Sequence, residues 1–386
     1  MDKFQKNYFD TTLLFIIFLF MIISCISVYS SQKYLPYQDN FALKQAVWFV
    51  AGLGFSSIIY LFDFEQIKRI SPFVYIFGIL VLLALFLAPE PFAKEIKGAK
   101  AWFLIPGFGS LQPSEFMKVF LILFVGKIIV NHNELYFHRT TGTDLLLLCK
   151  IGLATALPLA FILLQPDAGT AMVVTVIVIG MIFVSGINWR IIALLGILAA
   201  VLLGGLVYIY IETPDLLLLV LDQYQLNRVD AWLHPFKYRD GISYQLANSI
   251  LAIGSGTMYG KGFHGAQVIV PEAHSDFIFT IIGEEFGFFG ASIVISLYFI
   301  LIYRIIVIAL QNKGQYESII ATGVISMLTF HIFENIGMVI GLVPITGIPL
   351  PLLSYGGSSL LSTLLALSII LNISAKTKKY MFGEDD

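Results

Sequence analysis

The run TTLLFIIFLFMIISCISVYS, residues 11–30, begins the pattern that decides the fold. A helix that crosses about 30 Å of hydrocarbon needs about 20 predominantly apolar residues, and this run supplies them. It is longer than the apolar core of an ordinary signal peptide, and no convincing small-residue cleavage site follows it. We therefore expect residues 11–30 to stay in the protein as its first membrane span.

Further apolar stretches repeat this pattern, and together they predict ten spans. They run near residues 12–30, 45–62, 72–88, 115–130, 144–164, 169–186, 190–210, 276–308, 317–343 and 356–374. An even number of spans places both chain ends on one side of the membrane. The eighth stretch is too long for one straight span, so we expect its first turns at the membrane surface or a tilted helix.

The composition is that of a membrane protein. Hydrophobic residues make up 58% of the 386 residues and charged residues only 12%, whereas soluble domains contain about 25% charged residues. The short alternating segments of an outer-membrane barrel are absent, so helices are the spanning elements. We expect an all-α fold, a polytopic membrane helix bundle that forms a single domain over residues 1–386. The small net charge of −2 argues against a nucleic-acid partner.

The basic residues predict how the bundle is oriented. With a cytoplasmic N-terminus, the inner segments contain Lys3, Lys6, Lys68, Arg69, Lys127, Arg139, Arg190, Arg304, Lys313, Lys376, Lys378 and Lys379, and the short outer loops contain only Lys33, Lys44, Lys94, Lys97 and Lys100. Positive charge concentrates on the cytoplasmic side of membrane proteins. We therefore expect both termini to be cytoplasmic and residues 212–275, between spans 7 and 8, to form a large extracytoplasmic loop.

Chemistry is expected where this loop runs back into apolar sequence, at PEAHSDF, residues 271–277. Asp276 lies there at the edge of the hydrocarbon, close to His274 and just before the run FIFTII at 277–282. An ionised group near apolar surroundings is costly and needs a partner or a function. Asp276 is therefore the candidate catalytic residue.

Three further ionisable groups lie in or between spans. Glu115 and Lys118 are three residues apart and share one helix face. They form an internal ion pair, or they face a polar cavity and position a substrate group. Asp167 lies in QPDAGT, residues 165–170, where two spans join with almost no loop. It caps a tight turn or contributes to the site.

The outer segments contain the remaining candidates. Lys100 and Trp102 lie where lipid phosphate and sugar could bind, although a solvated loop with an interfacial tryptophan explains them as well. Arg228 lies in the long loop, and Lys261 stands there between two glycines that let the backbone approach an anion or simply form a turn. Ser358 opens the last span, where N–H groups at a helix start can hold phosphate or can be plainly capped.

Other polar side chains form a stripe and a pair. His331, Glu334 and Asn335 share one face of the ninth span, which favours a hydrogen-bond network between helices. Metal ligation would require a second cluster, for which Asp276 with Glu285 is a loose candidate.

Several motifs in this order resemble one known family. They are GAKAW at 98–102, QPSE at 112–115 with Lys118, QPDAGT at 165–170, RVDAWLHP at 228–235, HSDF at 274–277, and the stretch from NIGM at 335–338 to Ser359. The chain resembles the SEDS family (shape, elongation, division and sporulation), and within it the RodA branch. The resemblance covers residues 98–359, and its specificity comes from the ordered set of motifs.

The resemblance implies a ten-span peptidoglycan glycosyltransferase of the bacterial cytoplasmic membrane that polymerises lipid II on the outer face. It also implies a class B penicillin-binding protein as partner, together with other cell-elongation membrane proteins. Asp276 matches the essential aspartate of the family, Trp102 its outer-loop tryptophan, and Glu115 with Lys118 its paired helix residues. The family's basic residue before the tryptophan is replaced by Ala101, with Lys100 one place earlier.

The residues and the resemblance indicate one reaction. A general base must lie within about 3 Å of the acceptor hydroxyl that attacks the donor sugar, and Asp276 is at the required depth. Lys100, Lys118, Arg228 and Lys261, or a divalent cation such as Mg²⁺ or Mn²⁺, would offset charge on the leaving diphosphate. We expect Asp276, Trp102, Lys118 and Glu115 to converge on one outward-facing cavity that is open to lipid.

Two other functions fit the same composition. A flippase or transporter of lipid-linked wall precursors would also use buried charges along a polar path. A scaffold that organises wall-synthesis enzymes would tolerate replacement of Asp276. The concentration of polar groups on the outer half of the chain favours the glycosyltransferase over both.

Overall fold

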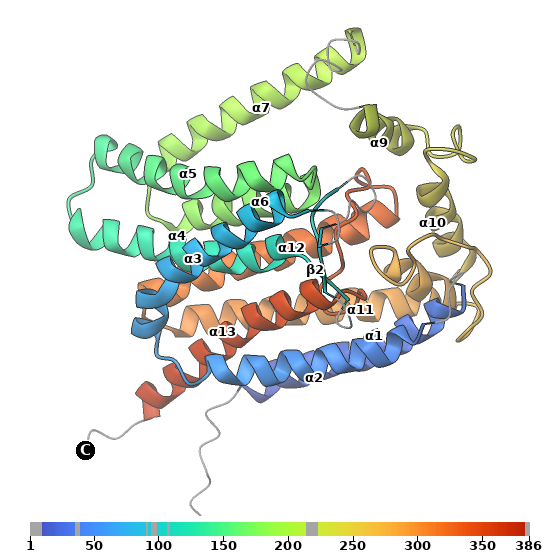
Figure 1. Cartoon of the computed structure of the whole chain (residues 1–386), viewed down its shortest axis with the longest axis horizontal. Coiled ribbons are helices and arrows are strands. Elements are labelled where there is room, and N and C mark those ends of the chain that lie inside the picture. The colour runs from blue at the N-terminus through green and yellow to red at the C-terminus, as the bar shows by residue number, and fades with distance from the viewer. Residues whose placement is uncertain are drawn as a thin grey trace, which may run out of the picture.

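The computed structural model describes residues 10–34, 39–89, 92–93, 99–105, 109–213 and 223–382. Long helices lie side by side in it (Figure 1). They are α1 (Thr11–Ser31), α2 (Phe41–Ile59), α3 (Phe64–Leu87), α4 (Pro113–Leu135), α5 (Thr141–Leu164), α6 (Ala168–Val184), α7 (Trp189–Glu212), α11 (Ile278–Gln311), α12 (Gln315–Val339) and α13 (Gly357–Phe382). The expected all-α membrane fold is confirmed.

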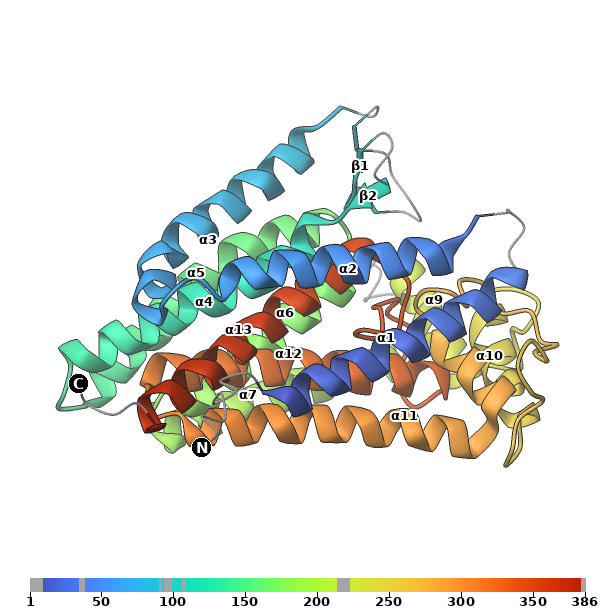
Figure 2. The same ribbon diagram turned by 90° about the horizontal axis from the view of Figure 1, so that it is seen from below.

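Short elements connect these helices. They are the 3₁₀ helix η1 (Gln32–Tyr34), the strands β1 (Phe103–Ile105) and β2 (Gly109–Leu111), and the helices α9 (Gln223–Leu233) and α10 (Tyr244–Ser255). The two strands pair antiparallel, with Phe103 opposite Leu111. In Figures 1 and 2, α9, α10 and the strands lie toward one end of the bundle, and the α4–α5 turn lies at the other.

Each of the ten expected spans falls on one of the long helices. Eight of these helices are long and apolar enough to cross a membrane, namely α1, α2, α3, α5, α7, α11, α12 and α13. Of the other two, α6 is apolar but has only 17 residues. The remaining helix, α4, carries Glu115, Lys118, Lys127 and Glu134, and it is less apolar because it supplies polar groups to the interior.

The first and last helices of the bundle are joined by Asp10. Its carboxylate caps α1 by accepting from Leu13 N at 3.0 Å and pairs with Arg304 Nη2 of α11 at 2.6 Å. Ser374 of α13 donates to the same carboxylate at 3.3 Å. The start of α1 and the end of α13 therefore lie at the same end of the bundle, as an even number of spans requires.

The long eighth stretch is two helical pieces. Gly287 interrupts α11 with φ +64° and ψ −159°, and the chain is helical on either side of it. A Cβ at this position would lie 2.4 Å from Gly260 N, so the residue also has to be small. Glycine alone combines this positive φ with so close a backbone contact. The break at Gly287 explains how residues 276–308, which are too long for one straight span, fit into the bundle.

The segment before α11 is packed onto it. Buried Glu284 accepts at one oxygen from Lys261 Nζ at 2.6 Å, Gln267 N at 2.8 Å and Val268 N at 3.1 Å. Its neighbour Glu285 accepts from Ser30 Oγ of α1 at 2.5 Å. Glu284 therefore fixes the end of the long loop before the chain reaches Asp276, and Glu285 joins α11 to α1.

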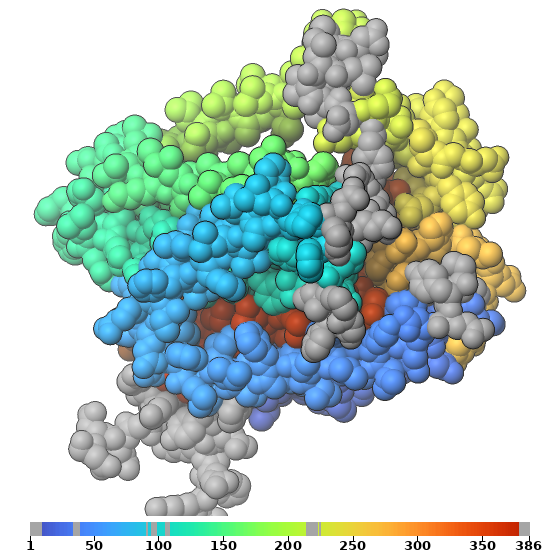
Figure 3. Space-filling view, viewed as in Figure 1, coloured from blue at the N-terminus to red at the C-terminus, as the bar shows by residue number. Residues whose placement is uncertain are grey.

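Helices α12 and α13 lie in the interior, whereas α7 lies outside. The membrane-length window of α13 is 83% buried and that of α7 is 0% buried. Figure 3 shows α13 between α2 and α3, behind them. Hydrogen bonds hold α7 near its two ends, from Asn188 N to Asp144 Oδ2 at 3.0 Å and from Tyr210 Oη to Asp230 Oδ1 at 2.5 Å.

We predict that Glu284→Ala lowers the free energy of unfolding by about 3 kcal/mol, because it leaves a half-buried lysine and two backbone N–H groups without their acceptor. Thermal unfolding of the purified protein in detergent measures this. Glu134→Ala is the matched control, because the Glu134 side chain is 63% exposed in its pair with Lys68 and a pair of this kind is worth less than about 1 kcal/mol. Equal losses of stability in the two variants would contradict the role given to Glu284.

Candidate functional site

Asp276 lies in a tight turn, residues 271–277, which we call the Asp276 turn. Its first part is closed by Glu272, whose φ is +59° and whose carbonyl accepts from Ser275 N at 3.0 Å and Phe277 N at 3.3 Å. His274 and Phe277 are buried on either side, while Ser275 and Asp276 are partly exposed. The turn therefore presents the Asp276 carboxylate at the start of α11.

Hydrogen bonds fix both ends of Asp276. Ser275 Oγ donates to its Oδ1 at 2.8 Å. Asn335 of α12 donates through Nδ2 to the backbone oxygen of Asp276 at 2.7 Å and to that of Ile348 at 2.8 Å. One amide thus joins the Asp276 turn to the segment of residues 346–348. Within those residues, Gly347 has φ +77°, and a Cβ there would lie 3.5 Å from Asp276 Oδ2.

A buried ionic cluster lies along α4, α12 and α13, and we call it the Lys118 cluster. Lys118 Nζ contacts both oxygens of Glu115, at 3.0 and 2.9 Å, and His331 Nε2 at 3.0 Å. Ser362 Oγ of α13 donates to Glu115 Oε2 at 3.0 Å. Lys118 is 1% exposed and Glu115 is 3% exposed. The internal ion pair expected from the three-residue spacing is present, and the polar stripe of α12 supplies its histidine.

Asp167 lies at the start of α6, close enough to this cluster to feel the charges of Glu115 and Lys118. It caps the helix by accepting from Thr170 N at 3.0 Å and Thr170 Oγ1 at 2.7 Å, and it accepts from Gln112 Nε2 at 2.8 Å. Burial raises the pKa of the Asp167 carboxyl above its usual value, and the hydrogen bonds from Thr170 act in the opposite direction. The helix-capping role that the sequence suggested is therefore present in the structure.

Ser358 lies on the same path. Its hydroxyl accepts from Gln112 N at 2.9 Å and donates to the carbonyl of Ser110 in β2 at 3.5 Å. Gln112 therefore touches both Ser358 and Asp167, although the sequence indicated it only as part of a motif. Its position directly before Pro113, the first residue of α4, is the signal that could have identified it.

Residues 346–348 lie between Asp167 and Asp276. A Cβ at Gly169 would lie 2.7 Å from Ile348 Cγ2 and 3.3 Å from Thr346 O, so this segment rests on the first turn of α6. Its other side faces Asp276 through Gly347. The starts of α4, α6, α11 and α13 therefore meet the C-terminal half of α12 around one short segment.

Two basic candidates of the long loop are bound to protein groups. Arg228 Nη1 donates to the carbonyls of Ile345 at 2.9 Å and Thr346 at 3.2 Å. Lys261 is paired with Glu284, as described above. Arg228 thus supports the segment beside Asp276. Lys261 instead contacts the first part of α11, through Glu284.

Lys100 and Trp102 lie directly before the first strand of the pair, β1. Lys100 Nζ donates to the carbonyls of Ala88 and Phe86 at the end of α3. Trp102 is half-buried directly before β1. Because Ser110 of β2 meets Ser358, this hairpin covers the start of α13. Gly98 of the GAKAW motif lies outside the described residues, as do Lys94 and Lys97.

The structure thus places Glu115, Lys118, Asp167, Ser358 and Asp276 toward one end of the bundle, where Glu115 pairs with Lys118 and Gln112 joins Asp167 to Ser358. Asp276 and Glu285 do not form a metal cluster with the α12 stripe. Across the residues that the structure describes, no three His, Cys, Asp or Glu side chains come together as a metal site.

Comparison with known proteins places these features in context. The family model for the cell cycle protein FTSW_RODA_SPOVE matches residues 5–379. Peptidoglycan glycosyltransferase MrdB of Escherichia coli K12 is 31% identical over 379 residues, which cover 97% of this chain and 95% of that protein. Stage V sporulation protein E of Bacillus subtilis is 32% identical over 376 residues, which cover 94% of each.

Solved structures agree with the sequence comparison. The crystal structure of the rod shape determining protein RodA from Thermus thermophilus has a TM-score of 0.67 and 25% identity, and covers 95% of this chain and 96% of that one. A chain of a peptidoglycan synthase complex that coordinates polymerization and crosslinking has a TM-score of 0.78 and 25% identity, over 97% and 99% of the chains. This protein belongs to the FtsW/RodA/SpoVE family, the SEDS family that its motifs resemble.

Proposed function

We propose that this protein is a peptidoglycan glycosyltransferase that polymerises lipid II on the outer face of the bacterial cytoplasmic membrane. Family membership and the names of its relatives support this activity. In the proposed orientation both termini are cytoplasmic, and the Asp276 turn faces outward with the segment 212–275. The distribution of basic residues supports that orientation.

The observation that carries the proposal is the placement of Asp276. Its turn is held by Asn335, Glu272 and Ser275 at the end of the bundle where four helix starts meet. The acceptor hydroxyl attacks the anomeric carbon of the donor sugar, and the bond to the lipid diphosphate breaks. Asp276 takes the proton from that hydroxyl as general base. A single displacement of this kind inverts the anomeric centre.

The leaving diphosphate needs positive charge or hydrogen-bond donors. Lys118 and Lys261 are each paired with a carboxylate, Glu115 and Glu284 respectively. Within the part of the chain that the structure describes, the hydrogen bonds of Lys100 go to carbonyl oxygens, which do not neutralise its charge for an anion above the hairpin. We propose that Lys100, Trp102, Arg228 and Ser358 contact the lipid-linked substrate directly. In this proposal Glu115, Lys118 and Asp167 bind it through the polar surface they share, and Lys261 acts by holding the loop.

We also propose that a divalent cation, Mg²⁺ or Mn²⁺, assists the reaction. Mg²⁺ is commonly held by one or two carboxylates together with substrate phosphates and water. Asp276 with Glu272, whose Oε2 lies 3.3 Å from the same Ser275 Oγ, fits such a sparse donor set. The cation would offset charge on the diphosphate of the substrate.

We assign the protein to cell elongation and to a class B penicillin-binding protein as transpeptidase partner. The NIGM stretch at 335–338 and the likeness to a RodA structure support the elongation branch. The likeness to a chain of a synthase complex that combines polymerization with crosslinking supports the partner. Other cell-elongation membrane proteins would join the same assembly.

We predict that Asp276→Asn lowers glycan polymerisation at least about 100-fold, because loss of a general base costs about 10²–10⁴ in rate. Purified protein is incubated with lipid II, and the products are separated on a gel. Asp240→Asn, an exposed aspartate of the same outer segment, is the matched control and should polymerise normally. Polymer formation retained by Asp276→Asn would disprove the catalytic role.

The same preparation separates a polymerase from a flippase. In sealed vesicles with labelled lipid II in the outward-facing leaflet only, a polymerase makes glycan without moving the labelled lipid across the vesicle membrane. A flippase moves label and makes no glycan.

We also predict a split between stability and activity in the Lys118 cluster. Lys118→Met leaves Glu115 buried without its cation and lowers the free energy of unfolding by about 3 kcal/mol. The double variant Glu115→Gln/Lys118→Met removes both charges and recovers most of that loss. If the pair also serves substrate binding, the double variant still polymerises at least about tenfold more slowly, measured as an initial rate.

Lys127→Met, on the same helix but outside the cluster, is the control and should change neither melting temperature nor rate. A double variant that regains both stability and full activity would show that Glu115 and Lys118 only support the fold.

A further inference from the structure

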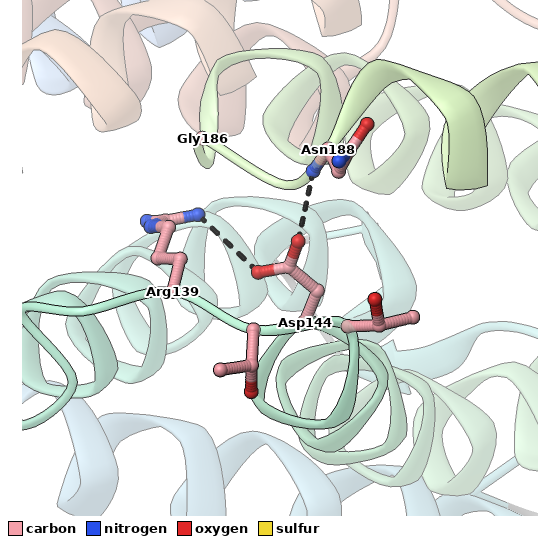
Figure 4. A pocket seen from close by; sticks show the side chains of 6 residues that line it. Arg139, Asp144, Gly186 and Asn188 are labelled. Carbon is pink, nitrogen blue, oxygen red and sulfur yellow. Dashed lines mark hydrogen bonds and ion pairs between the residues drawn. The ribbon is translucent and has the colours of Figure 1, made fainter.

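A second polar site lies at the end of the bundle opposite Asp276. It is a cavity of about 450 Å³ lined by Arg139, Thr140, Thr141, Asp144, Gly186 and Asn188. These residues come from the α4–α5 turn with the start of α5, and from the α6–α7 turn (Figure 4). The function proposed above uses none of them. We call this the Arg139 cavity.

The Arg139 guanidinium is held in place by two turns. Its Nη2 donates to the carbonyl of Ser185 at 2.8 Å and to Asn133 Oδ1 at 2.5 Å. Gly186 has φ +85°, and a Cβ there would lie 2.8–2.9 Å from the guanidinium atoms. The guanidinium therefore rests against the bare backbone of Gly186, and any larger residue would displace it. The guanidinium of Arg139 is therefore held at a fixed position, whereas the side chain of a solvent-exposed arginine would be free to move.

The charge of Arg139 is only partly neutralised. Asp144 Oδ1 lies 3.8 Å from Nη1, which is too long for a hydrogen bond, while its Oδ2 accepts from Asn188 N at 3.0 Å. Within the described part of the chain, Nε and Nη1 of Arg139 make no hydrogen bond. Lys150, which contacts His132 at 3.4 Å, and Arg190, two residues after Asn188, add positive charge nearby. The surroundings favour an anion over a cation.

Two helix starts add to this field. Thr140 caps α5 and Asn188 caps α7, and both capping residues line the cavity. The N-terminal end of a helix carries partial positive charge and N–H groups that favour anions such as phosphate. A guanidinium with open donors, two hydroxyl-bearing residues and two helix starts therefore face one space.

The depth of the cavity points to its ligand. It lies where spans α4, α5, α6 and α7 end or begin, which is the level of lipid headgroups in a membrane-spanning bundle. Basic pockets between helices at the cytoplasmic surface bind anionic headgroups. A volume of about 450 Å³ is within the range of small-molecule sites. We propose that the Arg139 cavity binds the phosphate group of an anionic lipid headgroup in the leaflet at this end.

The test uses the full-length protein purified in detergent and native mass spectrometry with added phosphatidylglycerol. Thr141→Glu places a negative charge at the mouth of the cavity, where a helix start tolerates an acidic residue well. Thr141→Gln is the matched neutral control. We expect Thr141→Glu to weaken phosphatidylglycerol binding about fivefold, the effect of one charge at a membrane surface, with Thr141→Gln unchanged.

Arg139→Gln should weaken binding at least as much. If it also lowers the melting temperature, the Thr141 pair decides the outcome, because both of those variants keep the hydrogen bonds of Arg139. Arg69→Gln, an exposed arginine of α3, is the control for nonspecific attraction and should bind like the unchanged protein.

Binding measurements with a second lipid and with soluble phosphate compounds identify the class of ligand. Phosphatidylcholine should bind at least about fivefold more weakly than phosphatidylglycerol. Inorganic phosphate and glycerol phosphate should fail to displace the lipid at equal concentration. Displacement by either would reassign the cavity to a soluble phosphate compound and overturn the lipid proposal. Equal phosphatidylglycerol binding by Thr141→Glu and Thr141→Gln would overturn the site itself.

Discussion

The buried ion pair between Lys118 and Glu115 is the constraint on which the interior depends. A charge taken out of water costs several kcal/mol unless it is paired and fully hydrogen-bonded. Both residues project from α4, so the two charges are matched within one helix before any packing occurs. His331 and Ser362 then complete the set from α12 and α13. These three helices can approach one another closely only in the arrangement that satisfies all four side chains.

The spans could be predicted because the length of an apolar run depends only on consecutive residues of the sequence. All ten stretches fall on helices, since a bilayer demands about 20 apolar residues wherever a helix crosses it. Their neighbours were not predictable in the same way. A leucine that faces lipid and a leucine that faces α12 look alike in sequence. The signal that separates buried α13 from α7 lay in other residues, because α13 contains several serines and Asn372 whereas α7 contains no serine, threonine or asparagine. The break at Gly287 was also hidden, because its cause is the approach of Gly260, a contact made only after folding.

The site residues could be predicted where they are charged side chains next to apolar sequence, because such side chains are rare there. Asp276, Asp167 and the Glu115–Lys118 pair stood out as charges next to apolar sequence. The partners of Arg228 were not visible, because Ile345 and Thr346 offer only backbone carbonyls and lie far along the chain, 117 and 118 residues away. Neither was the double contact of Asn335, an ordinary amide on a helix until the Asp276 turn and Ile348 reach it. Side chains that bind backbone leave little trace in sequence.

Helix α7 illustrates how differently parts of this chain are constrained. None of its side chains is fully buried, although Ile191 and Ile192 near its start pack against the core, and it is held near its ends by Asn188 and Tyr210. Within this chain, mutations along its middle meet few neighbouring side chains. We therefore expect exchanges there among leucine, isoleucine, valine and alanine to carry little penalty, and substitutions at the two anchoring ends to cost more. Sequence divergence within such a helix would then record the membrane it crosses more than the protein it belongs to.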